Sequence, residues 1–319
     1  MNSNIKICVI GAGLWGKNHI RTLNNMGYLY GIVDENKDQL DTIKNLNNDC
    51  SFFTKIEQTF DYDFDGYIIA TPVVSHYNIA KELLEKSKNI LIEKPITMDA
   101  ISASKLLILA KERNVFAMGG HLLLYHPAFV KMKELIHEGK IGKIKYIYSN
   151  RLNFGKIRQI EDVLWSLAPH DISLFLFFAN SNSFSTKYIG NSIVSEHNDD
   201  SSLSSFLFEN GIQGHIFVNW LHPFKEHRFV IIGDKGMLVF EDSIKDKKII
   251  FHKKDVLIEE NNISMNDQGS QLIDFPNEMA LENQLKYFVS SIKNNSNDLS
   301  NLELSVNVVQ ALETLNSNE

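Results

Sequence analysis

The sequence predicts an α/β domain with a doubly wound parallel sheet, followed by an α+β domain with an open, mostly antiparallel sheet. In the first third of the chain, short apolar runs alternate with amphipathic stretches. After about Gly119 this alternation gives way to runs separated by polar turns, as in hairpins. The 319 residues are enough for two domains, which we place at residues 1–120 and 121–319.

The strands of the first domain are predicted from runs that are apolar throughout and often β-branched. Such runs are typical of parallel strands covered by helices on both faces. Between them, apolar residues recur three and four positions apart, which is the spacing of an amphipathic helix. We expect helices at His76–Lys86 and Asp99–Arg113, and strands at Ile5–Ile10, Tyr28–Val33, Tyr67–Ala70, Asn89–Ile92 and Val115–Met118.

The second domain is predicted to combine a sheet with helices on one of its faces, which leaves the other face open to pair with a second subunit. Turns such as Glu209-Asn210-Gly211 separate its later runs, as in antiparallel hairpins. The predicted strands are Lys145–Leu152, Ser202–Phe208, Ile212–Trp220, Arg228–Ile232 and Met237–Phe240. The predicted helices are Pro127–Glu138, Pro169–Phe178, Asn277–Lys293 and Leu302–Leu315.

Composition excludes several classes of protein. Hydrophobic residues make up 44% and charged residues 22% of the chain, which is the balance of a globular protein and not of a disordered one. The net charge of −7 offers no basic face for nucleic acid. The most apolar window, residues 174–178, is too short to span a membrane. With two unrelated cysteines and no signal peptide, we expect a cytoplasmic protein without disulfides or a metal site.

A glycine-rich turn after the first predicted strand indicates a dinucleotide site. In the hexapeptide Gly11–Gly16, the first glycine allows a tight turn, Gly13 lets the backbone approach a pyrophosphate, and Gly16 lets helix and strand pack closely. Backbone N–H groups at the start of the next helix would bind the phosphates. We therefore expect a Rossmann domain whose cofactor contacts include Gly11, Gly13, Leu14, Trp15 and Gly16.

Asp34 bears on the choice of cofactor. It ends the second predicted strand, 18 residues after Gly16, where a carboxylate can accept hydrogen bonds from both ribose hydroxyls. A carboxylate there repels a 2′-phosphate, and the next residues, Glu35 and Asn36, include no arginine to neutralise one. NAD is therefore favoured over NADP, although Lys37 lies close by in the sequence.

A lysine directly after a predicted strand is the first candidate for catalysis. Glu93-Lys94-Pro95 follows the run Asn89–Ile92, and the carboxyl ends of parallel strands line the ligand crevice in open sheets of this kind. With the glycine-rich turn and Ala70-Thr71-Pro72 after an earlier strand, this segment resembles the Gfo/Idh/MocA oxidoreductase family. The resemblance covers essentially the whole chain.

That resemblance implies roles for residues near Lys94 and an oligomeric state. It places Lys94 near both the nicotinamide and the substrate, and it implies that Glu93, Thr71, Pro72 and His76 contact the cofactor. It also implies a C-terminal domain with an open antiparallel sheet and a homodimer or homotetramer assembled through that sheet.

A later segment, Ser166-Leu167-Ala168-Pro169-His170-Asp171, resembles the family motif that carries the catalytic histidine. The matching residue is His170. Ser166 stands where many polyol-oxidising members have aspartate, which speaks against a simple inositol or glucose dehydrogenase. Taken alone, His170 is equally well explained as a capping or core histidine at the start of a helix.

Two stretches, residues 120–127 and 149–158, resemble sugar-nucleotide 3-dehydrogenases, which oxidise the C3 hydroxyl of UDP-N-acetylglucosamine or close relatives. The second stretch carries three cations and two amides, and two of the cations, Arg151 and Arg158, could bind a diphosphate bidentately. A solvated turn is the alternative explanation. The substrate-binding set implied is Tyr125, Arg151, Asn153, Arg158, Trp165 and His170.

We expect NAD-dependent oxidation of a nucleotide-linked N-acetylhexosamine at C3, with the keto product passing to an aminotransferase in surface-glycan or lipid A biosynthesis. Lys94 and His170 both contact the reacting hydroxyl in this hypothesis, and the residues leave open which of them accepts its proton. The alternatives are a 3-ketosugar reductase, a free sugar or polyol dehydrogenase, and a non-catalytic NAD-sensing regulator. Reduction of NAD in the presence of candidate sugars separates these alternatives.

Overall fold

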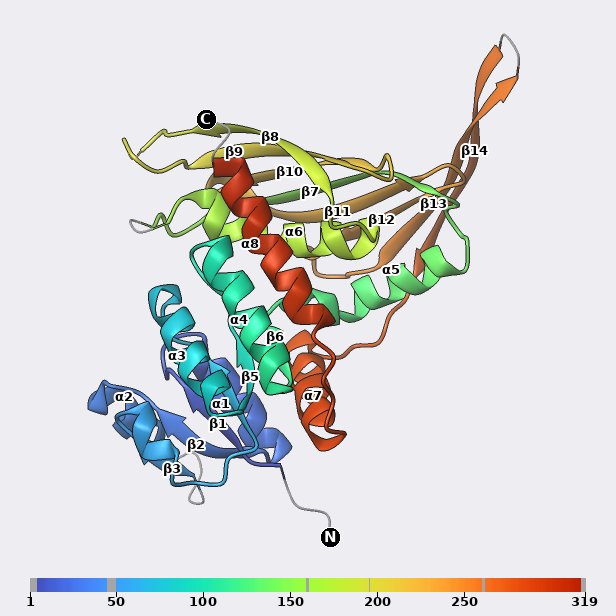
Figure 1. The fold of residues 1–319 in the computed structure, drawn as a ribbon. Coiled ribbons are helices and arrows are strands. Elements are labelled where there is room, and N and C mark those ends of the chain that lie inside the picture. Colours follow the sequence, from blue (N-terminus) through green and yellow to red (C-terminus); the bar gives the residue numbers. More distant parts are fainter. Residues whose placement is uncertain (1–4, 45–49, 159–160, 195, 260–261, 317–319) are drawn as a thin grey trace. The chain divides into compact units, whose positions relative to one another are not determined.

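The computed structural model describes residues 5–44, 50–158, 161–194, 196–259 and 262–316, and they form two compact units (Figure 1). The first unit comprises Met1–Leu122 and Ala280–Gln310, and the second comprises Leu123–Met279 and Ala311–Glu319. Among the described residues, no helix is both long and apolar enough to cross a membrane.

The first unit contains the predicted parallel sheet, with strand order β3-β2-β1-β4-β5-β6. Its strands are β1 (Ile7–Ile10), β2 (Leu29–Val33), β3 (Ser51–Phe53), β4 (Gly66–Ile69), β5 (Asn89–Ile92) and β6 (Ala117–Gly119). Its helices α1 (Gly16–Met26), α2 (Lys37–Ile43), α3 (Val73–Glu85) and α4 (Ala100–Arg113) alternate with them. Every residue of β1 and β4 is buried, as expected of central strands covered on both faces. The strand order reverses between β1 and β4, where such sheets bind ligands.

Two C-terminal helices, α7 (Ala280–Lys293) and the greater part of α8 (Ser300–Asn316), belong to the first unit. Phe288 and Ile292 of α7 pack against Gly66 of β4, which leaves them room because it has no side chain. A Cβ on Gly66 would lie only 2.6 Å from Ile292 Cδ1. The sequence prediction placed residues 121–319 in one C-terminal domain, whereas the structure groups α7 and most of α8 with the parallel sheet. The amphipathic pattern identifies the buried face of a helix but not the sheet that the face covers.

The second unit is built on an eight-stranded sheet with the order β14-β13-β12-β11-β7-β10-β9-β8. Among the strand pairs of the described residues in this unit, only β7 with β10 is parallel, so the predicted mostly antiparallel sheet is confirmed. The strands are β7 (Ile144–Phe154), β8 (Phe184–Asn191), β9 (Ser201–Phe208), β10 (Gln213–Asn219), β11 (Leu221–Gly233), β12 (Met237–Glu241), β13 (Ile249–Glu259) and β14 (Asn262–Ile273). Helices α5 (Pro127–His137) and α6 (Val163–Ala179) complete the unit.

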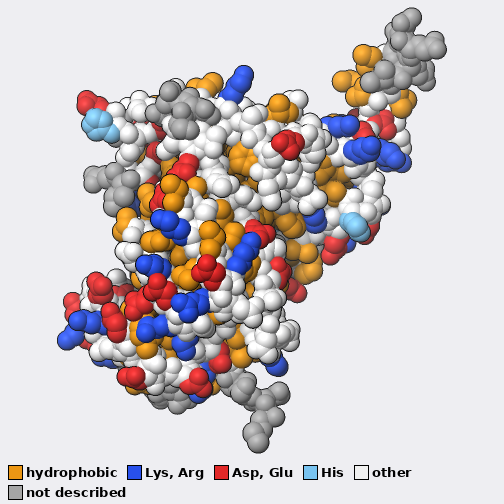
Figure 2. All heavy atoms as spheres, viewed as in Figure 1, with side chains coloured by type: hydrophobic (Ala, Val, Ile, Leu, Met, Phe, Trp, Pro, Cys, Tyr) orange, Lys and Arg blue, Asp and Glu red, His pale blue; other side chains and the backbone are white. Residues whose placement is uncertain are grey.

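The two faces of this sheet differ in burial. On the face toward α6, Phe206, Ile216 and Val218 are almost inaccessible to solvent. On the opposite face, Leu203 is 41% and Leu207 49% exposed. Farther along the sheet, β13 and β14 continue as a two-stranded ribbon with hydrophobic side chains gathered near its end (Figures 1 and 2). The open sheet face expected from the sequence is therefore present within this unit.

Helix α6 begins earlier than the sequence predicts. We expected it to start at Pro169, since proline favours the first turn of a helix, but Asp162 caps it by accepting a hydrogen bond from the backbone N–H of Trp165 (2.8 Å). Pro169 lies inside the helix. Most α6 residues are buried, so packing outweighs the hydrogen bond that the proline cannot donate.

The Asp162 cap makes stability depend on pH. Burial, together with the charge of Asp199, raises the pKa of Asp162 from 3.8 to about 6. Because the pKa of Asp162 is raised in the folded protein, the contribution of this carboxyl group to stability is complete below about pH 4 and is lost as the pH rises through about 6. Asp162→Asn keeps a capping oxygen and removes the charge. At pH 7.5 we expect this variant to be more stable than the unmodified chain by about 2 kcal/mol, measured by urea unfolding.

The same measurement at pH 4 is the internal control, because the unmodified Asp162 is then largely protonated and the difference should shrink. A variant that is less stable than the unmodified chain at pH 7.5 would contradict this prediction and would show that the ionised carboxylate stabilises α6.

Candidate active site

The glycine-rich turn after β1 is pressed against the end of β4. Gly11 has a φ of +95°, and a Cβ there would lie 2.7 Å from the carbonyl oxygen of Ala70. A Cβ on Gly16 would collide with the carbonyl oxygen of Gly11. Gly13, in contrast, has no atom within 4 Å of such a Cβ. The turn is therefore closely packed at both ends and open at Gly13.

The open turn has the features that a dinucleotide requires. No side chain caps the first turn of α1, and Leu14 is 92% exposed beside Gly13, so a phosphate could approach the backbone there. Asp34 directly follows β2, and its carboxylate accepts hydrogen bonds from the backbone N–H groups of Ala12 (2.6 Å) and Asn36 (2.8 Å). Asp34 thus lies against the turn, and these residues fit a nicotinamide dinucleotide.

The segments that follow β4 and β5 are joined by His76. Its Nδ1 lies 3.0 Å from the carbonyl oxygen of Pro95 and its Nε2 lies 2.8 Å from that of Thr71. Burial lowers the pKa of His76, although both carbonyl contacts act in the opposite direction. His76, only 1% exposed, therefore ties Thr71, which precedes Pro72, to Pro95, the residue after Lys94.

Glu93, immediately before Lys94, is enclosed by protein. Its Oε1 accepts a hydrogen bond from Trp15 Nε1 (2.5 Å) and lies 2.7 Å from His19 Nε2. Its Oε2 accepts from the backbone N–H of Lys94 (3.1 Å). Burial raises the pKa of Glu93, but the contacts with His19 and Trp15 and the charge of Lys94 outweigh burial and lower it. Glu93 is therefore an ionised carboxylate between α1 and Lys94.

His121, just after β6, is a second buried histidine near this carboxylate. It is 1% exposed, and neither ring nitrogen has a hydrogen-bond partner among the described residues. Burial lowers its pKa to about 4, and the charge of Lys94 contributes to the lowering. His121 is consequently neutral near pH 7.

His170 lies in the third turn of α6, and the next residue anchors that helix to the sheet. Asp171 accepts hydrogen bonds from Arg151 Nε (2.6 Å) and Nη2 (3.1 Å) of β7. Ser149 Oγ of the same strand donates to Asp171 as well (2.5 Å). Two of the three guanidinium nitrogens of Arg151 are thus hydrogen-bonded to Asp171, which lies on the same helix as His170.

The sequence analysis assigned no catalytic or binding role to His227 of β11. It pairs in register with Arg151 of β7, so the two side chains lie on the same face of the sheet. That face is turned toward Asp171 of α6, which Arg151 contacts. Burial and the charges of Arg151 and Lys225 lower the pKa of His227 to about 4. Only the pairing of β7 with β11, which has no local sequence signal, could have revealed this position.

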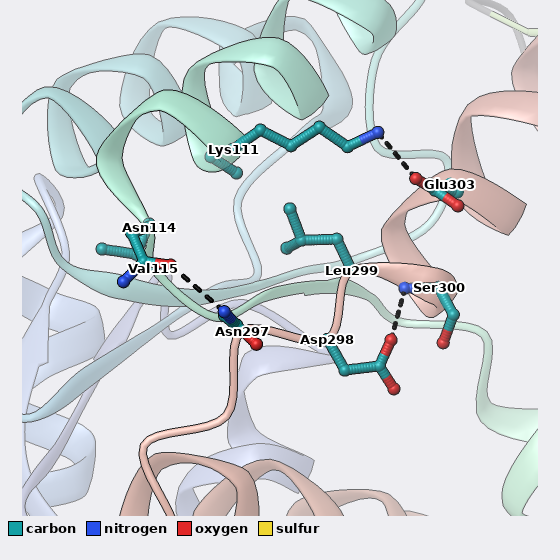
Figure 3. A pocket seen from close by; sticks show the side chains of 9 residues that line it. Lys111, Asn114, Val115, Asn297, Asp298, Leu299, Ser300 and Glu303 are labelled. Atoms are coloured by element: carbon teal, nitrogen blue, oxygen red, sulfur yellow. Dashed lines mark hydrogen bonds and ion pairs between the residues drawn. The ribbon is translucent and has the colours of Figure 1, made fainter.

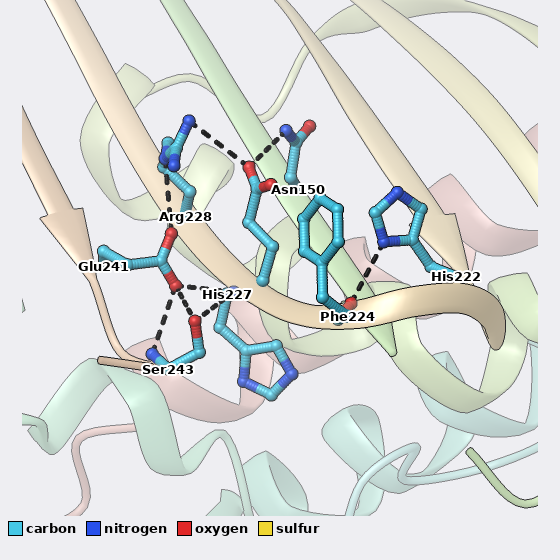
Figure 4. A network of polar contacts seen from close by, with 8 residues as sticks. Asn150, His222, Phe224, His227, Arg228, Glu241 and Ser243 are labelled. Carbon is cyan, nitrogen blue, oxygen red and sulfur yellow. Dashed lines mark hydrogen bonds and ion pairs between the residues drawn. The ribbon is translucent and has the colours of Figure 1, made fainter. Parts of the chain in front are cut away.

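A polar network fixes the segment that carries His227 (Figure 4). Glu241 of β12 accepts hydrogen bonds from the backbone N–H of His227 (2.8 Å) and from Arg228 Nε (3.2 Å). Glu226 accepts a hydrogen bond from Asn150 Nδ2 (2.8 Å) and forms an ion pair with Arg228. The segment of β11 around His227 is therefore held by side chains of both neighbouring strands, β12 and β7.

The remaining predicted substrate residues are spread over the second unit. Arg158 pairs with Glu161, three residues further along the chain. Asn153, the second-to-last residue of β7, has a buried Oδ1 that has no hydrogen-bond partner within the described ranges. Trp165 is 8% exposed in the first turn of α6, and Tyr125 ends the 3-10 helix Leu122–Tyr125. Of the six predicted residues, Arg151 is tied through Asp171 to the part of α6 that carries His170.

A pocket of about 340 Å³ lies elsewhere in the first unit, between the end of α4 and the start of α8 (Figure 3). Lys111 and Glu303 form an ion pair across it (2.7 Å), and Asn297 donates a hydrogen bond to Asn114. Val115 in its wall precedes β6, so the pocket is at the amino end of that strand, whereas Lys94 follows the carboxyl end of β5. This pocket is therefore distinct from the candidate active site. No cluster of three or more metal-binding side chains occurs in the described part of the chain.

Comparison with known proteins supports the family suggested by these residues. A 27% identical relative, the UDP-N-acetylglucosamine 3-dehydrogenase of Acidithiobacillus ferrooxidans, aligns over 60% of this chain and 59% of its own length. A solved structure of an enzyme of that name from the same species has a TM-score of 0.85 at 20% identity, over 98% of this chain and 97% of that one. A 3-ketoreductase from Actinomadura kijaniata, solved with TDP-benzene and NADP, has a TM-score of 0.82 at 15% identity, over 99% and 98%.

Two family descriptions match successive parts of the chain. Residues 5–121 match the oxidoreductase family with an NAD-binding Rossmann fold, and residues 129–239 match the C-terminal domain of the same family. The first match contains the glycine-rich turn and Lys94, and the second contains Arg151 and His170. This chain belongs to the Gfo/Idh/MocA oxidoreductase family.

Proposed function

We propose that the chain oxidises the C3 hydroxyl of a nucleotide-linked N-acetylhexosamine, UDP-N-acetylglucosamine or a close relative, to the 3-keto sugar with NAD. The observation that carries the proposal is the fixed position of Lys94, directly after β5 and tied through Glu93 to the helix that follows the open glycine-rich turn. The name of the 27% identical relative supports the substrate class.

The proposed chemistry assigns one role to each candidate residue. A bound nicotinamide supplies a hydride acceptor for the hydrogen on C3. His170 accepts the proton of the C3 hydroxyl, and Lys94 donates a hydrogen bond to the same oxygen. For the nucleotide sugar we propose contacts from Tyr125, Asn153, Arg158 and Trp165. Arg151, engaged by Asp171, would act mainly by holding the helix that carries His170.

We propose NAD in preference to NADP. Asp34 Oδ2 accepts a hydrogen bond from the Ala12 N–H of the glycine-rich turn, and Oδ1 accepts one from the Asn36 N–H. A carboxylate held in this way beside the turn would repel a 2′-phosphate. The 3-ketoreductase from Actinomadura kijaniata was solved with NADP, so we base the proposed preference on Asp34 of this chain and not on relatives.

The same residues could run the reaction in reverse, as a 3-ketosugar reductase, and the 3-ketoreductase relative favours this as a second candidate. In either direction a 3-keto nucleotide sugar is the oxidised partner. Its carbonyl is a substrate for an aminotransferase, which we propose as the next enzyme in surface-glycan or lipid A biosynthesis. A non-catalytic regulator would bind NAD and leave it oxidised with every sugar nucleotide.

We also propose that two copies pair through the open face of the eight-stranded sheet. That face carries Phe217 and the stacked rings of Tyr148 and His215 (5.2 Å between ring centres), beside the exposed Leu203 and Leu207. Pairing would bury these groups, and repetition would give a tetramer.

A charge on the open sheet face should disrupt this assembly. We expect the unmodified chain to be at least dimeric by light scattering at micromolar concentration, and Phe217→Glu to be monomeric. Lys140→Glu, in an exposed turn after α5, is the control and should leave the mass unchanged. A monomeric unmodified chain would contradict the proposal.

Removal of the candidate acid–base groups should reduce turnover much more than cofactor affinity. With NAD and UDP-N-acetylglucosamine, we expect His170→Ala and Lys94→Ala to lower kcat by about 10²–10⁴-fold, since a positioned acid or base contributes that much. Reduced nicotinamide is followed by absorbance, and NAD affinity by calorimetry. Arg158→Ala is the comparison and should raise KM with kcat unchanged. A His170→Ala variant with unchanged hydride transfer at all pH values would show that His170 is structural.

Two glycines of the turn should respond differently to an added methyl group. Gly13→Ala meets no protein atom, so we expect unchanged stability but NAD binding weakened by about tenfold or more, because the methyl occupies the approach to the pyrophosphate. Gly16→Ala meets the Gly11 carbonyl and should lower the free energy of unfolding by about 1–3 kcal/mol. Equal NAD affinity of Gly13→Ala and the unmodified chain would place the phosphates elsewhere.

A further inference from the structure

Glu93 was expected from the sequence to contact the cofactor, but its carboxylate is used within the protein. Trp15 and His19 engage Oε1, and the Lys94 N–H engages Oε2. The side chain of Glu93 is only 10% exposed. Hydrogen bonds to an ionised carboxylate are among the strong ones in proteins. The geometry therefore describes an internal connection, which a contact between Glu93 and the cofactor would add to and not replace.

His19 serves this connection alone. The residue is completely buried, its Nε2 contacts Glu93, and its Nδ1 has no hydrogen-bond partner within the described ranges. A histidine buried with an unsatisfied nitrogen costs stability, so its contact with Glu93 is the physical reason for a polar residue here. Because His19 is inaccessible, it touches neither cofactor nor substrate.

The other side of Glu93 is closed by the segment after β6. A Cβ on Gly120 would lie 3.0 Å from Glu93 Cα, so the two segments pack closely and an added methyl group would push Glu93 aside. His121 lies close enough for the charges of Glu93 and Lys94 to affect its pKa. The carboxylate is thus held from α1 on one side and from the end of β6 on the other.

The contacts of Glu93 connect two parts of the proposed site. Trp15 is the residue before α1 and belongs to the glycine-rich turn, while Lys94 is covalently next to Glu93. A shift of the turn therefore moves two hydrogen-bond donors of Glu93, and a shift of Glu93 moves the Lys94 backbone.

We propose that Glu93 is a positioning residue that, through His19 and Trp15, couples dinucleotide binding at the Gly11–Gly16 turn to the placement of Lys94. The inference rests on the proposed function, because it assigns the turn to the dinucleotide and Lys94 to the reacting hydroxyl. Coupling of this kind is reciprocal, so Lys94 should contribute to NAD affinity only while the connection is intact.

His19→Leu tests the coupling without touching either ligand. It removes the donor to Glu93 and keeps an apolar side chain of similar size in a buried place. We expect kcat to fall by about 10- to 100-fold, the range for a hydrogen bond to a charged group. NAD binding should weaken less, by about three- to tenfold, because the connection reaches the dinucleotide only through the turn. His19→Gln restores an N–H donor and should recover most of both losses, which a purely structural role would not predict.

The coupling itself is measured by NAD calorimetry on four proteins: unmodified, Lys94→Ala, His19→Leu and the double variant. We expect Lys94→Ala to weaken NAD binding in the unmodified background and to have little further effect in the His19→Leu background. Thr22→Val is the matched control, since Thr22 lies on the same helix and donates only to the Asn18 carbonyl (2.8 Å). It should change neither affinity nor turnover.

The outcomes separate this proposal from the proposed function. Additive effects of His19→Leu and Lys94→Ala on NAD affinity, or unchanged kcat in a folded His19→Leu, would overturn the coupling. If His19→Leu fails to fold, Trp15→Phe takes its place, because it keeps an aromatic ring at a 40% exposed position and removes only the indole donor. An unmodified chain that binds NAD but reduces none of it would overturn the proposed function, and the calorimetric cycle would still decide the coupling.

Discussion

The close approach of the glycine-rich turn to the end of β4 is the constraint on which the rest of the first unit depends. Gly11 and Gly16 have no room for a side chain, so the turn packs directly against Ala70 and α1 starts close to the sheet. That starting point places Trp15 and His19, four residues apart on one helix face, within reach of Glu93. A bulkier turn would move α1 outward and leave the Glu93 carboxylate buried without its donors, which is costly.

Local patterns predicted the parts of the structure that depend on neighbouring residues. The apolar runs gave the central strands β1, β4 and β5, and glycine spacing gave the turn, because both features repeat over a few residues. The short strand β3, the edge strand β8 and the ribbon of β13 and β14 were not expected, since edge strands lack a continuous apolar run. The predicted start of α6 at Pro169 was wrong because the prediction relied on the proline and did not consider Asp162 as a cap.

The polar contacts of the candidate site could not be predicted in the same way. His19 with Glu93, and Arg151 with Asp171, join residues 74 and 20 positions apart, and each pair depends on tertiary packing. The i, i+4 spacing of Trp15 and His19 is a usable signal for one helix face but does not identify the partner. Arg151 illustrates the consequence, because its charge suggested a diphosphate contact and the fold gives most of its guanidinium to Asp171. Buried charges are paired, and sequence alone does not show with what.

We propose above all that this chain transfers the hydrogen on C3 of a nucleotide sugar as a hydride to or from a nicotinamide. The most direct measurement uses UDP-N-acetylglucosamine deuterated only at C3, incubated with the protein and NAD, with the nicotinamide then analysed by NMR. If hydride is transferred from C3, deuterium appears at C4 of the reduced nicotinamide and the sugar becomes a 3-ketone. Reduced nicotinamide without deuterium, or a sugar that keeps its deuterium while NAD is reduced, would contradict oxidation at C3.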